Sequence, residues 1–178
     1  HSKVRIGKST HALQIAFFIA WLLAGGKMVP TDKLNARGYP YWTVGKSPAK
    51  KINFGLDNIV FSPTELMKKA HTLYEKYGKN QVIVYDEGRA GLDSARAMEQ
   101  VNKAMQDFFQ ECGFMGHVIL VVLPNFFKLH EDYAVSRSVF LVDVYTNAKL
   151  ERGFFSFYNE RQKEFLYFLG KKRIGASL

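Results

Sequence analysis

The sequence predicts an α/β fold with a mainly parallel central sheet flanked by helices, and with antiparallel strands in its C-terminal part. Two short apolar runs, residues 81–85 and 117–123, are typical of strands buried on both faces, as in a parallel sheet. A segment with helical spacing precedes each run, and strands that alternate with helices over short connections indicate an α/β sheet. After Ser138 the pattern becomes one of strands only.

The first expected element is a helix over the apolar residues 12–24. This stretch of about 13 residues is shorter than the roughly 20 apolar residues that a membrane span requires. Polar residues precede it and Gly25-Gly26 follows it, which is typical of a helix buried in a protein core. We therefore expect a core helix rather than a signal sequence, and no transmembrane segment in this chain.

Two further helices have clear start or stop signals. The first is expected to begin with Ser62 as N-cap, Pro63 at the first helical position and Glu65 completing a capping box, and to end at Gly78. The second is expected over residues 94–112, where an apolar stripe recurs at helical spacing before Gly113.

Two regions depart from this alternation. Residues 29–53 have no periodicity and contain three prolines, so we expect an inserted loop or a small subdomain there. Residues 139–145, 154–158 and 164–169 are predicted strands, so residues 139–170 are expected to be a β-rich extension of the sheet. The chain as a whole, residues 1–178, is expected to form a single domain.

The composition narrows the classes of function. With 47% hydrophobic and 23% charged residues, the chain is an ordinary globular sequence rather than a disordered or fibrous one. A net charge of +9 favours polyanionic partners such as nucleic acid. The single cysteine, Cys112, excludes an internal disulfide and fits a reducing compartment, so we expect a cytoplasmic protein.

The first chemical motif opens the N-terminal helix. Gly7, Lys8, Ser9 and Thr10 form the second half of a phosphate-binding P-loop, in which helix N–H groups hold phosphate oxygens, the lysine reaches the β- and γ-phosphates and the serine hydroxyl ligates Mg²⁺. The full pattern has a glycine five positions before Gly7, where this chain has Ser2. The residues predict binding of ATP with Mg²⁺, and the alternative is a chance tetrapeptide.

The second motif ends the strand at residues 81–85. Asp86 is expected to hold Mg²⁺, and Glu87 to orient or deprotonate the water that attacks the γ-phosphate. The alternative is a polar turn after a strand. Asn125, which follows the next predicted strand, is expected to contact the γ-phosphate, and its alternative is an ordinary loop residue after Pro124.

Taken together, GKST on its helix, VIVYDEGRAGLD, and HVILVVLPNFFKL before a β-rich tail resemble the additional-strand P-loop ATPases. Within them the chain is most similar to the FtsK/HerA branch, which includes DNA pumps, viral packaging ATPases and Zot-like phage morphogenesis ATPases. The resemblance implies a P-loop NTPase fold and ATP hydrolysis coupled to DNA translocation or packaging, for a virus or mobile element. It also implies self-association into a ring, expected to be a hexamer, with an arginine finger between subunits. Arg137 and Arg89 are the candidates.

The segment 29–53 interleaves cations with aromatic residues. Phosphates pair with cations, and bases stack on exposed rings, so Lys46, Lys50, Lys51 and Trp42 are candidate DNA contacts. The alternative is a surface loop whose aromatic residues pack back onto the domain. The histidines lack the spacing of a metal site, so no metal other than Mg²⁺ is expected.

Two other functions remain open. A Zot-like nucleotide-binding assembly protein would use the same ATP site for phage morphogenesis at a membrane. A small-molecule kinase would use the same loop, but it has no need of a water-activating glutamate beside Asp86.

Overall fold

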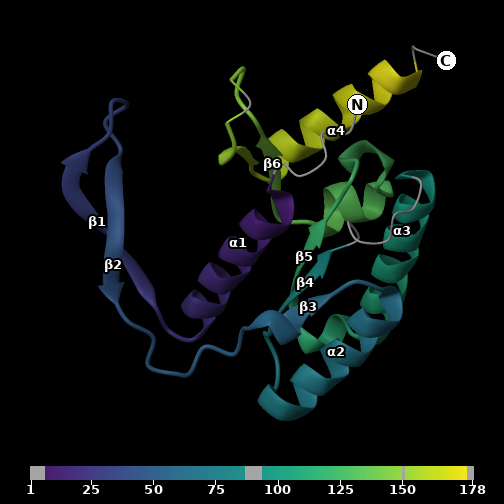
Figure 1. The fold of residues 1–178 in the computed structure, drawn as a ribbon, viewed down its shortest axis with the longest axis horizontal. Coiled ribbons are helices and arrows are strands. Elements are labelled where there is room, and N and C mark those ends of the chain that lie inside the picture. The colour runs from purple at the N-terminus through teal and green to yellow at the C-terminus, as the bar shows by residue number, and fades with distance from the viewer. Residues whose placement is uncertain (1–6, 87–93, 150, 176–178) are drawn as a thin grey trace.

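A three-stranded parallel sheet forms the centre of the computed structural model, which describes residues 7–86, 94–149 and 151–175 (Figure 1). Its order is β3-β4-β5, with β3 at Ile59–Val60, β4 at Val82–Asp86 and β5 at Val118–Val122. The long helices are α1 (Lys8–Leu23), α2 (Pro63–Tyr77), α3 (Ser94–Glu111) and α4 (Glu160–Gly175). Two antiparallel hairpins lie outside the sheet, β1 (Lys27–Leu34) with β2 (Pro40–Lys46) and β6 (Leu141–Tyr145) with β7 (Phe154–Tyr158). The α/β class, the parallel sheet with flanking helices and the C-terminal antiparallel strands are thus confirmed.

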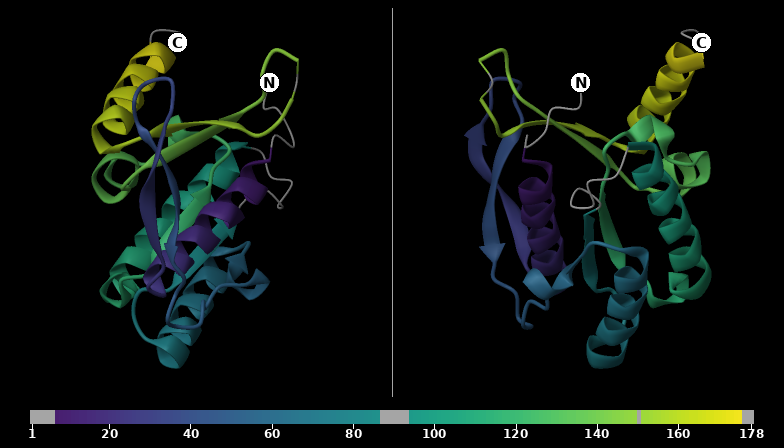
Figure 2. Two further views of the ribbon diagram at one scale, coloured as in Figure 1. Left: turned by 90° about the vertical axis from the view of Figure 1, so that its left-hand side faces the viewer. Right: turned by 45° about the vertical axis from the view of Figure 1, so that its right-hand side comes forward.

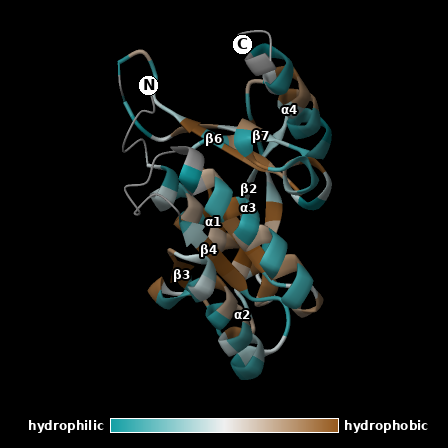
Figure 3. Cartoon of the chain, turned by 90° about the vertical axis from the view of Figure 1, so that its right-hand side faces the viewer, coloured by the Kyte–Doolittle hydropathy of each residue, from teal (hydrophilic) through white to brown (hydrophobic). Residues whose placement is uncertain are grey.

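The sheet divides the core into two layers because side chains alternate along β4. Val82 and Val84 face α1, where they pack with Ala16, Ala20 and Leu120. Ile83 and Tyr85 face the opposite way and pack with the apolar stripes of α2 and α3. All five residues of β4 are buried, as expected for a strand covered on both faces, and Figure 3 shows the hydrophobic character of this strand. In β5 only Leu120 is buried to the same extent.

The predicted limits of α2 are confirmed. The Ser62 side chain accepts a hydrogen bond from the Glu65 backbone N–H at 3.2 Å, and Pro63 is the first helical residue. The Glu65 carboxylate in turn accepts from the Phe61 N–H at 2.8 Å. The second bond of the expected capping box is therefore made to the residue before the N-cap, and not to the N-cap itself. Gly78 ends the helix with a φ of 79°, a conformation that favours glycine.

His117, just before β5, joins α2 to the start of β4. Its Nδ1 accepts the Gln81 backbone N–H at 3.1 Å, and its Nε2 lies 3.1 Å from the Ala70 carbonyl oxygen in α2. The two partners together require a neutral ring that carries its proton on Nε2. Burial lowers the pKa of His117, against the smaller opposing effect of the Ala70 carbonyl.

The N-terminal helix is less buried than the core helix that its sequence predicts. Ala16 and Ala20 are its buried residues, while Phe17, Phe18, Leu22 and Leu23 are each 40–49% exposed. Among the described residues, none of the helices combines the length and the hydropathy that crossing a bilayer would need.

The segment 29–53, expected to be an aperiodic loop or small subdomain, contains most of a β-hairpin. β1 and β2 pair in antiparallel register, with irregularities after Lys27 and between Pro30 and Leu34. No residue of either strand is buried. Because neither face packs against the core, the sequence lacks the alternation of apolar and polar residues that marks a half-buried strand.

The strand predicted at residues 164–169 is wrong, because these residues belong to α4. Asn159 and Gln162 form reciprocal bonds of 3.0 and 3.1 Å between side chain and backbone, which is a capping box at the helix start. The Asn-Glu-Arg-Gln residues at 159–162 therefore begin a helix and do not form a turn between strands. The β-rich C-terminal part is limited to β6 and β7, and the chain returns to helix after Tyr158. The expected extension of the central sheet over residues 139–170 is also wrong, because in the described part of the chain β6 and β7 pair only with each other in a separate two-stranded sheet.

Lys163 fastens α4 to the segment that follows β5. Its side chain is fully buried, and its ammonium donates to the carbonyls of Ala134, Val135 and Ser138 and to the Ser138 hydroxyl at 2.7–2.9 Å. These acceptors lie in and just after a π-helical turn at Asp132–Arg137. Burial lowers the pKa of Lys163, while the carboxylates of Glu160 and Glu164 act in the opposite direction.

We predict that Lys163→Met lowers the free energy of unfolding by about 1–3 kcal/mol, because the buried carbonyls would be left without their donor. Urea unfolding monitored by circular dichroism measures the change. Lys172→Met, an exposed position on the same helix, is the control and should stay within about 0.5 kcal/mol of the parent. Equal stabilities for the two variants would contradict a structural role for the Lys163 ammonium.

His117 predicts a pH dependence of stability. Its pKa is lowered in the folded state, so the unfolded chain binds the proton more readily. The contribution of His117 is therefore complete above the unfolded pKa of about 6.5 and is lost as the pH falls towards the folded value. We expect the stability difference between the parent and His117→Gln to narrow from pH 7.5 to pH 5.5 in urea titrations. A stability difference that stays constant between these two pH values would contradict this role of His117.

Candidate functional site

The N terminus of α1 lies at the carboxyl-terminal edge of the parallel sheet. The helix begins at Lys8, after Gly7 in the left-handed conformation with a φ of 95°. No side chain among the described residues caps this end. The first backbone N–H groups of a helix have no partner within the helix and favour negative charge, so this edge is suited to an anion.

Lys8 reaches across the end of β5. Its ammonium donates a hydrogen bond to the Leu123 carbonyl at 3.1 Å, and Leu123 directly follows the strand. This contact joins residues 115 positions apart in the chain. It places the cation of the GKST motif above the sheet edge, where the sequence predicts the phosphates of ATP.

Asp86 lies at the same edge and on the same face as α1. It is the last residue of β4 and pairs in register with Val122, one residue before the carbonyl that Lys8 contacts. Because side chains alternate along a strand, Asp86 shares the face of Val82 and Val84, which pack on α1. Its side chain is buried, at 7% exposure. The structure thus brings Lys8 and Asp86 to one edge, as the two motifs predict.

Ser9 and Thr10 occupy the first turn of α1, and both are exposed. The Ser9 hydroxyl and the Asp86 carboxylate are oxygen ligands of the kind that Mg²⁺ prefers, and they lie on elements that meet at this edge. Glu87, the expected water-activating residue, and Arg89 lie outside the described residues.

Asn125 lies two residues beyond Leu123 at the end of β5. Its side-chain oxygen accepts the Phe127 backbone N–H at 3.0 Å and caps a short helical turn at Phe126–Lys128. The loop-residue interpretation is therefore partly correct, since Asn125 has a local structural role. Its amide nitrogen is a separate donor group and can serve the expected contact with phosphate.

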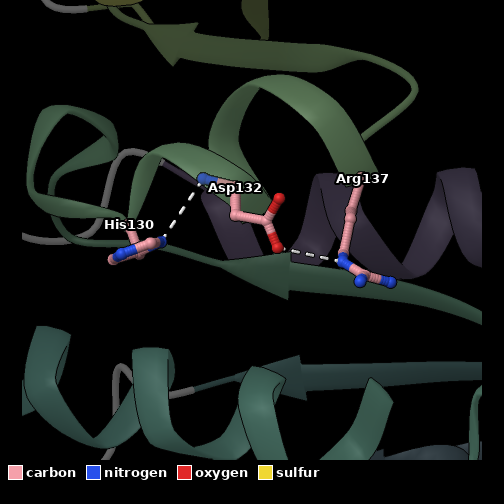
Figure 4. A network of polar contacts seen from close by, with 3 residues as sticks. All are labelled: His130, Asp132 and Arg137. Atoms are coloured by element: carbon pink, nitrogen blue, oxygen red, sulfur yellow. Dashed lines mark hydrogen bonds and ion pairs between the residues drawn. The ribbon is translucent and has the colours of Figure 1, made fainter. Parts of the chain in front are cut away.

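Arg137 is held by its own chain (Figure 4). Its Nε donates to the Asp132 carboxylate at 3.1 Å, and its guanidinium lies 4.9 Å from the centre of the Phe109 ring on α3. The His130 ring accepts the Asp132 backbone N–H at 3.3 Å. The arginine is about half exposed, so the structure shows an anchored surface residue, and its expected role as an arginine finger in a neighbouring subunit stays a prediction.

Among the candidate DNA contacts, Lys50 lies at the opposite end of α1 from Lys8. Trp42, Lys46, Lys50 and Lys51 are exposed, and the Lys50 backbone N–H donates to the Ala24 carbonyl beyond the far end of α1. At 1.5 Å per residue, the 16-residue helix separates its two ends by about 24 Å. The alternative, in which the aromatic residues of this segment pack back onto the domain, is wrong for Trp42, which is 60% exposed.

Sequence reasoning missed a contact between α1 and the C-terminal hairpin. The rings of His11, in the first turn of α1, and Phe155, in β7, have centres 4.5 Å apart. The His11 Nε2 is buried, with no hydrogen-bond partner among the described residues. Hairpin β6–β7 therefore lies beside the helix end that carries Lys8 (Figure 2). No local pattern indicates this contact, because the two residues are far apart in the chain.

No known protein family matches the sequence, and no curated protein matches it either.

We predict that Asn125→Asp lowers ATP turnover by about ten- to a hundred-fold while leaving stability near that of the parent. The aspartate oxygen keeps the cap on Phe127, but the N–H donor is removed and a negative charge is placed where the γ-phosphate is expected. Asn125→Ala is the comparison, since it also removes the cap and should be less stable by about 1 kcal/mol. Turnover and thermal unfolding are measured on the same samples. If ATP turnover is unchanged in Asn125→Asp, the role of Asn125 is limited to capping the turn at Phe126–Lys128.

Proposed function

We propose that the chain binds ATP with Mg²⁺ and hydrolyses it at the carboxyl-terminal edge of β4 and β5. The observation that carries this proposal is the 3.1 Å contact between the Lys8 ammonium and the Leu123 carbonyl, at the edge where Asp86 ends β4. Ligands of open parallel α/β sheets bind outside the carboxyl ends of the strands, where these groups lie.

The donor set suits a triphosphate. Lys8 is bound to a neutral carbonyl, and a phosphate oxygen would replace that acceptor with a stronger, charge-assisted one. The N–H groups of the first turn of α1 would complete the cradle. Ser9 and Asp86 would hold Mg²⁺, which supplies charge neutralisation on the β- and γ-phosphates.

Hydrolysis rather than transfer to a small molecule is supported by Glu87 next to the metal-binding Asp86. Glu87 would orient a water molecule or accept its proton, and Lys8 would balance the charge that develops on the γ-phosphate oxygens. Asn125 would contact the γ-phosphate from the neighbouring strand.

We propose DNA translocation or packaging in a ring, expected to be a hexamer, as the process that uses this energy. The support is the resemblance in motif order, together with the net charge of +9. Stimulation of ATP turnover by DNA tests this part and distinguishes it from a Zot-like assembly protein.

We predict that Lys8→Ala abolishes measurable hydrolysis and weakens ATP binding by about ten- to a hundred-fold, the value of a hydrogen bond to a charged group. Isothermal titration with ATP and Mg²⁺, paired with a phosphate-release assay, measures both. The control is Lys68→Ala, which removes an exposed lysine from α2 on the other face of the sheet. Parent-like turnover in Lys8→Ala would overturn the assignment of the site.

Glu87→Gln is the companion variant. Lys8, Ser9 and Asp86 remain, so affinity should stay near that of the parent while turnover falls by about 10²–10⁴-fold. If affinity falls along with the rate, Glu87 is a structural residue or a metal ligand rather than the base.

A further inference from the structure

Hairpin β1–β2 and the segment after it, residues 27–51, form what we call the arm. The arm lies at the side of the molecule next to α1 (Figures 1 and 2). No residue of its two strands is buried. A two-stranded hairpin in water is at best marginally stable by itself. A binding partner that covers the arm would therefore stabilise it.

Positive charge is concentrated in the arm. It carries six cations and one carboxylate, a net charge of +5 out of the +9 of the whole chain: Lys27, Lys33, Arg37, Lys46, Lys50 and Lys51 against Asp32. Among the described residues the only ion pair joins Arg137 to Asp132, so none of the arm's cations is paired with a described carboxylate. A polyanion would supply the missing countercharge.

Two of these cations oppose each other across the hairpin. Lys27 pairs in register with Lys46, and like charges directly opposite on neighbouring strands are destabilising. Lys50 and Lys51 follow β2 within five residues of Lys46 and add to the positive charge at the base of the arm. A phosphate bound there would reduce this repulsion.

Three aromatic residues of the arm are exposed. Tyr39 is 66% exposed, Tyr41 56% and Trp42 60%. Trp42 pairs in register with Pro30, and the neighbouring Tyr41 lies on the other face, because consecutive strand residues point to opposite faces. Rings on both faces suit a flexible strand of bases that wraps around the arm.

We propose that the arm binds single-stranded nucleic acid, with Tyr41 and Trp42 stacking on bases and Lys27, Lys46, Lys50 and Lys51 pairing with phosphates. This inference rests on the proposed action on DNA, and it names the form of the polymer. A duplex would satisfy the lysines but presents no unstacked bases to the rings.

Other occupants fit the arm less well. A second copy of the chain brings its own charge of +9 and leaves the cations unpaired. An anionic bilayer would meet only one face of the hairpin and would leave either Tyr41 or Trp42 uncovered, because consecutive strand residues point to opposite faces.

The test is fluorescence anisotropy, without ATP, with a labelled oligo(dT) of about 20 nucleotides and with a labelled duplex of equal length. This length is chosen because a single-strand binding site covers roughly 4–16 nucleotides. We expect tighter binding of oligo(dT), and a fall in that affinity of about five- to a hundred-fold in Trp42→Ala. Lys46→Ala/Lys50→Ala/Lys51→Ala should lower the log–log salt slope by about 0.7 for each phosphate that is no longer neutralised. The controls are Phe165→Ala, an exposed ring on α4, and Lys68→Ala/Lys76→Ala/Lys79→Ala, which removes three lysines elsewhere.

Three outcomes would overturn the proposal. The first is that the parent binds the duplex and oligo(dT) with equal affinity and that Trp42→Ala changes neither. The second is that the parent binds only to vesicles that contain anionic lipid. The third is that Trp42→Ala changes the oligomeric state and leaves the affinity for oligo(dT) unchanged. Because binding is measured without ATP, its failure is separate from failure of the nucleotide site. A parent protein that hydrolyses ATP but does not bind oligo(dT) would refute the arm alone, and one that binds oligo(dT) but not ATP would refute the site alone.

Discussion

The close packing of α1 on β4 and β5 determines where the candidate site forms. Ala16 and Ala20 are the buried residues of that helix, and they meet Val82, Val84 and Leu120. Their small side chains let the helix axis approach the sheet closely, and a larger residue there would overpack the layer at a cost of about 1–3 kcal/mol. This packing fixes the height and direction of α1, so that Lys8 reaches the carbonyl that follows β5.

Parallel register then brings the other groups to the same edge. Because β4 and β5 run in the same direction, their carboxyl ends coincide, and Asp86 lies opposite Val122. The segment after β5 is in turn tied to α4 by the Lys163 ammonium and by the Tyr167 hydroxyl, which donates to the Leu129 carbonyl at 2.8 Å. Asn125 thus lies between a strand end and an anchored segment, and Arg137 lies within the part that Lys163 holds.

Two of the exposed apolar regions in the described part of the chain differ in character. The outer face of α1 exposes Phe17, Phe18, Leu22 and Leu23 without charged residues between them. The arm also exposes apolar residues, but it mixes them with most of the chain's excess positive charge. Charge is what distinguishes a surface suited to nucleic acid from one that packing alone would cover.

The sequence by itself determined the elements whose signals are local. The capping residues around Ser62 set the start of α2, the apolar run before Asp86 set β4, and GKST set the polar opening of α1. The predictions were wrong where an element is stabilised by residues far away in the chain. Residues 164–169 were predicted as a strand, but α4 is held by contacts of Lys163 and Tyr167 with Ala134 and Leu129, which lie 29 and 38 residues upstream. The arm lacks a recognisable period because neither of its faces meets the core. Only the tertiary structure decided that Lys8 contacts Leu123 and that His11 contacts Phe155, since contacts across more than a hundred residues depend on how layers pack and leave no periodic trace in the chain.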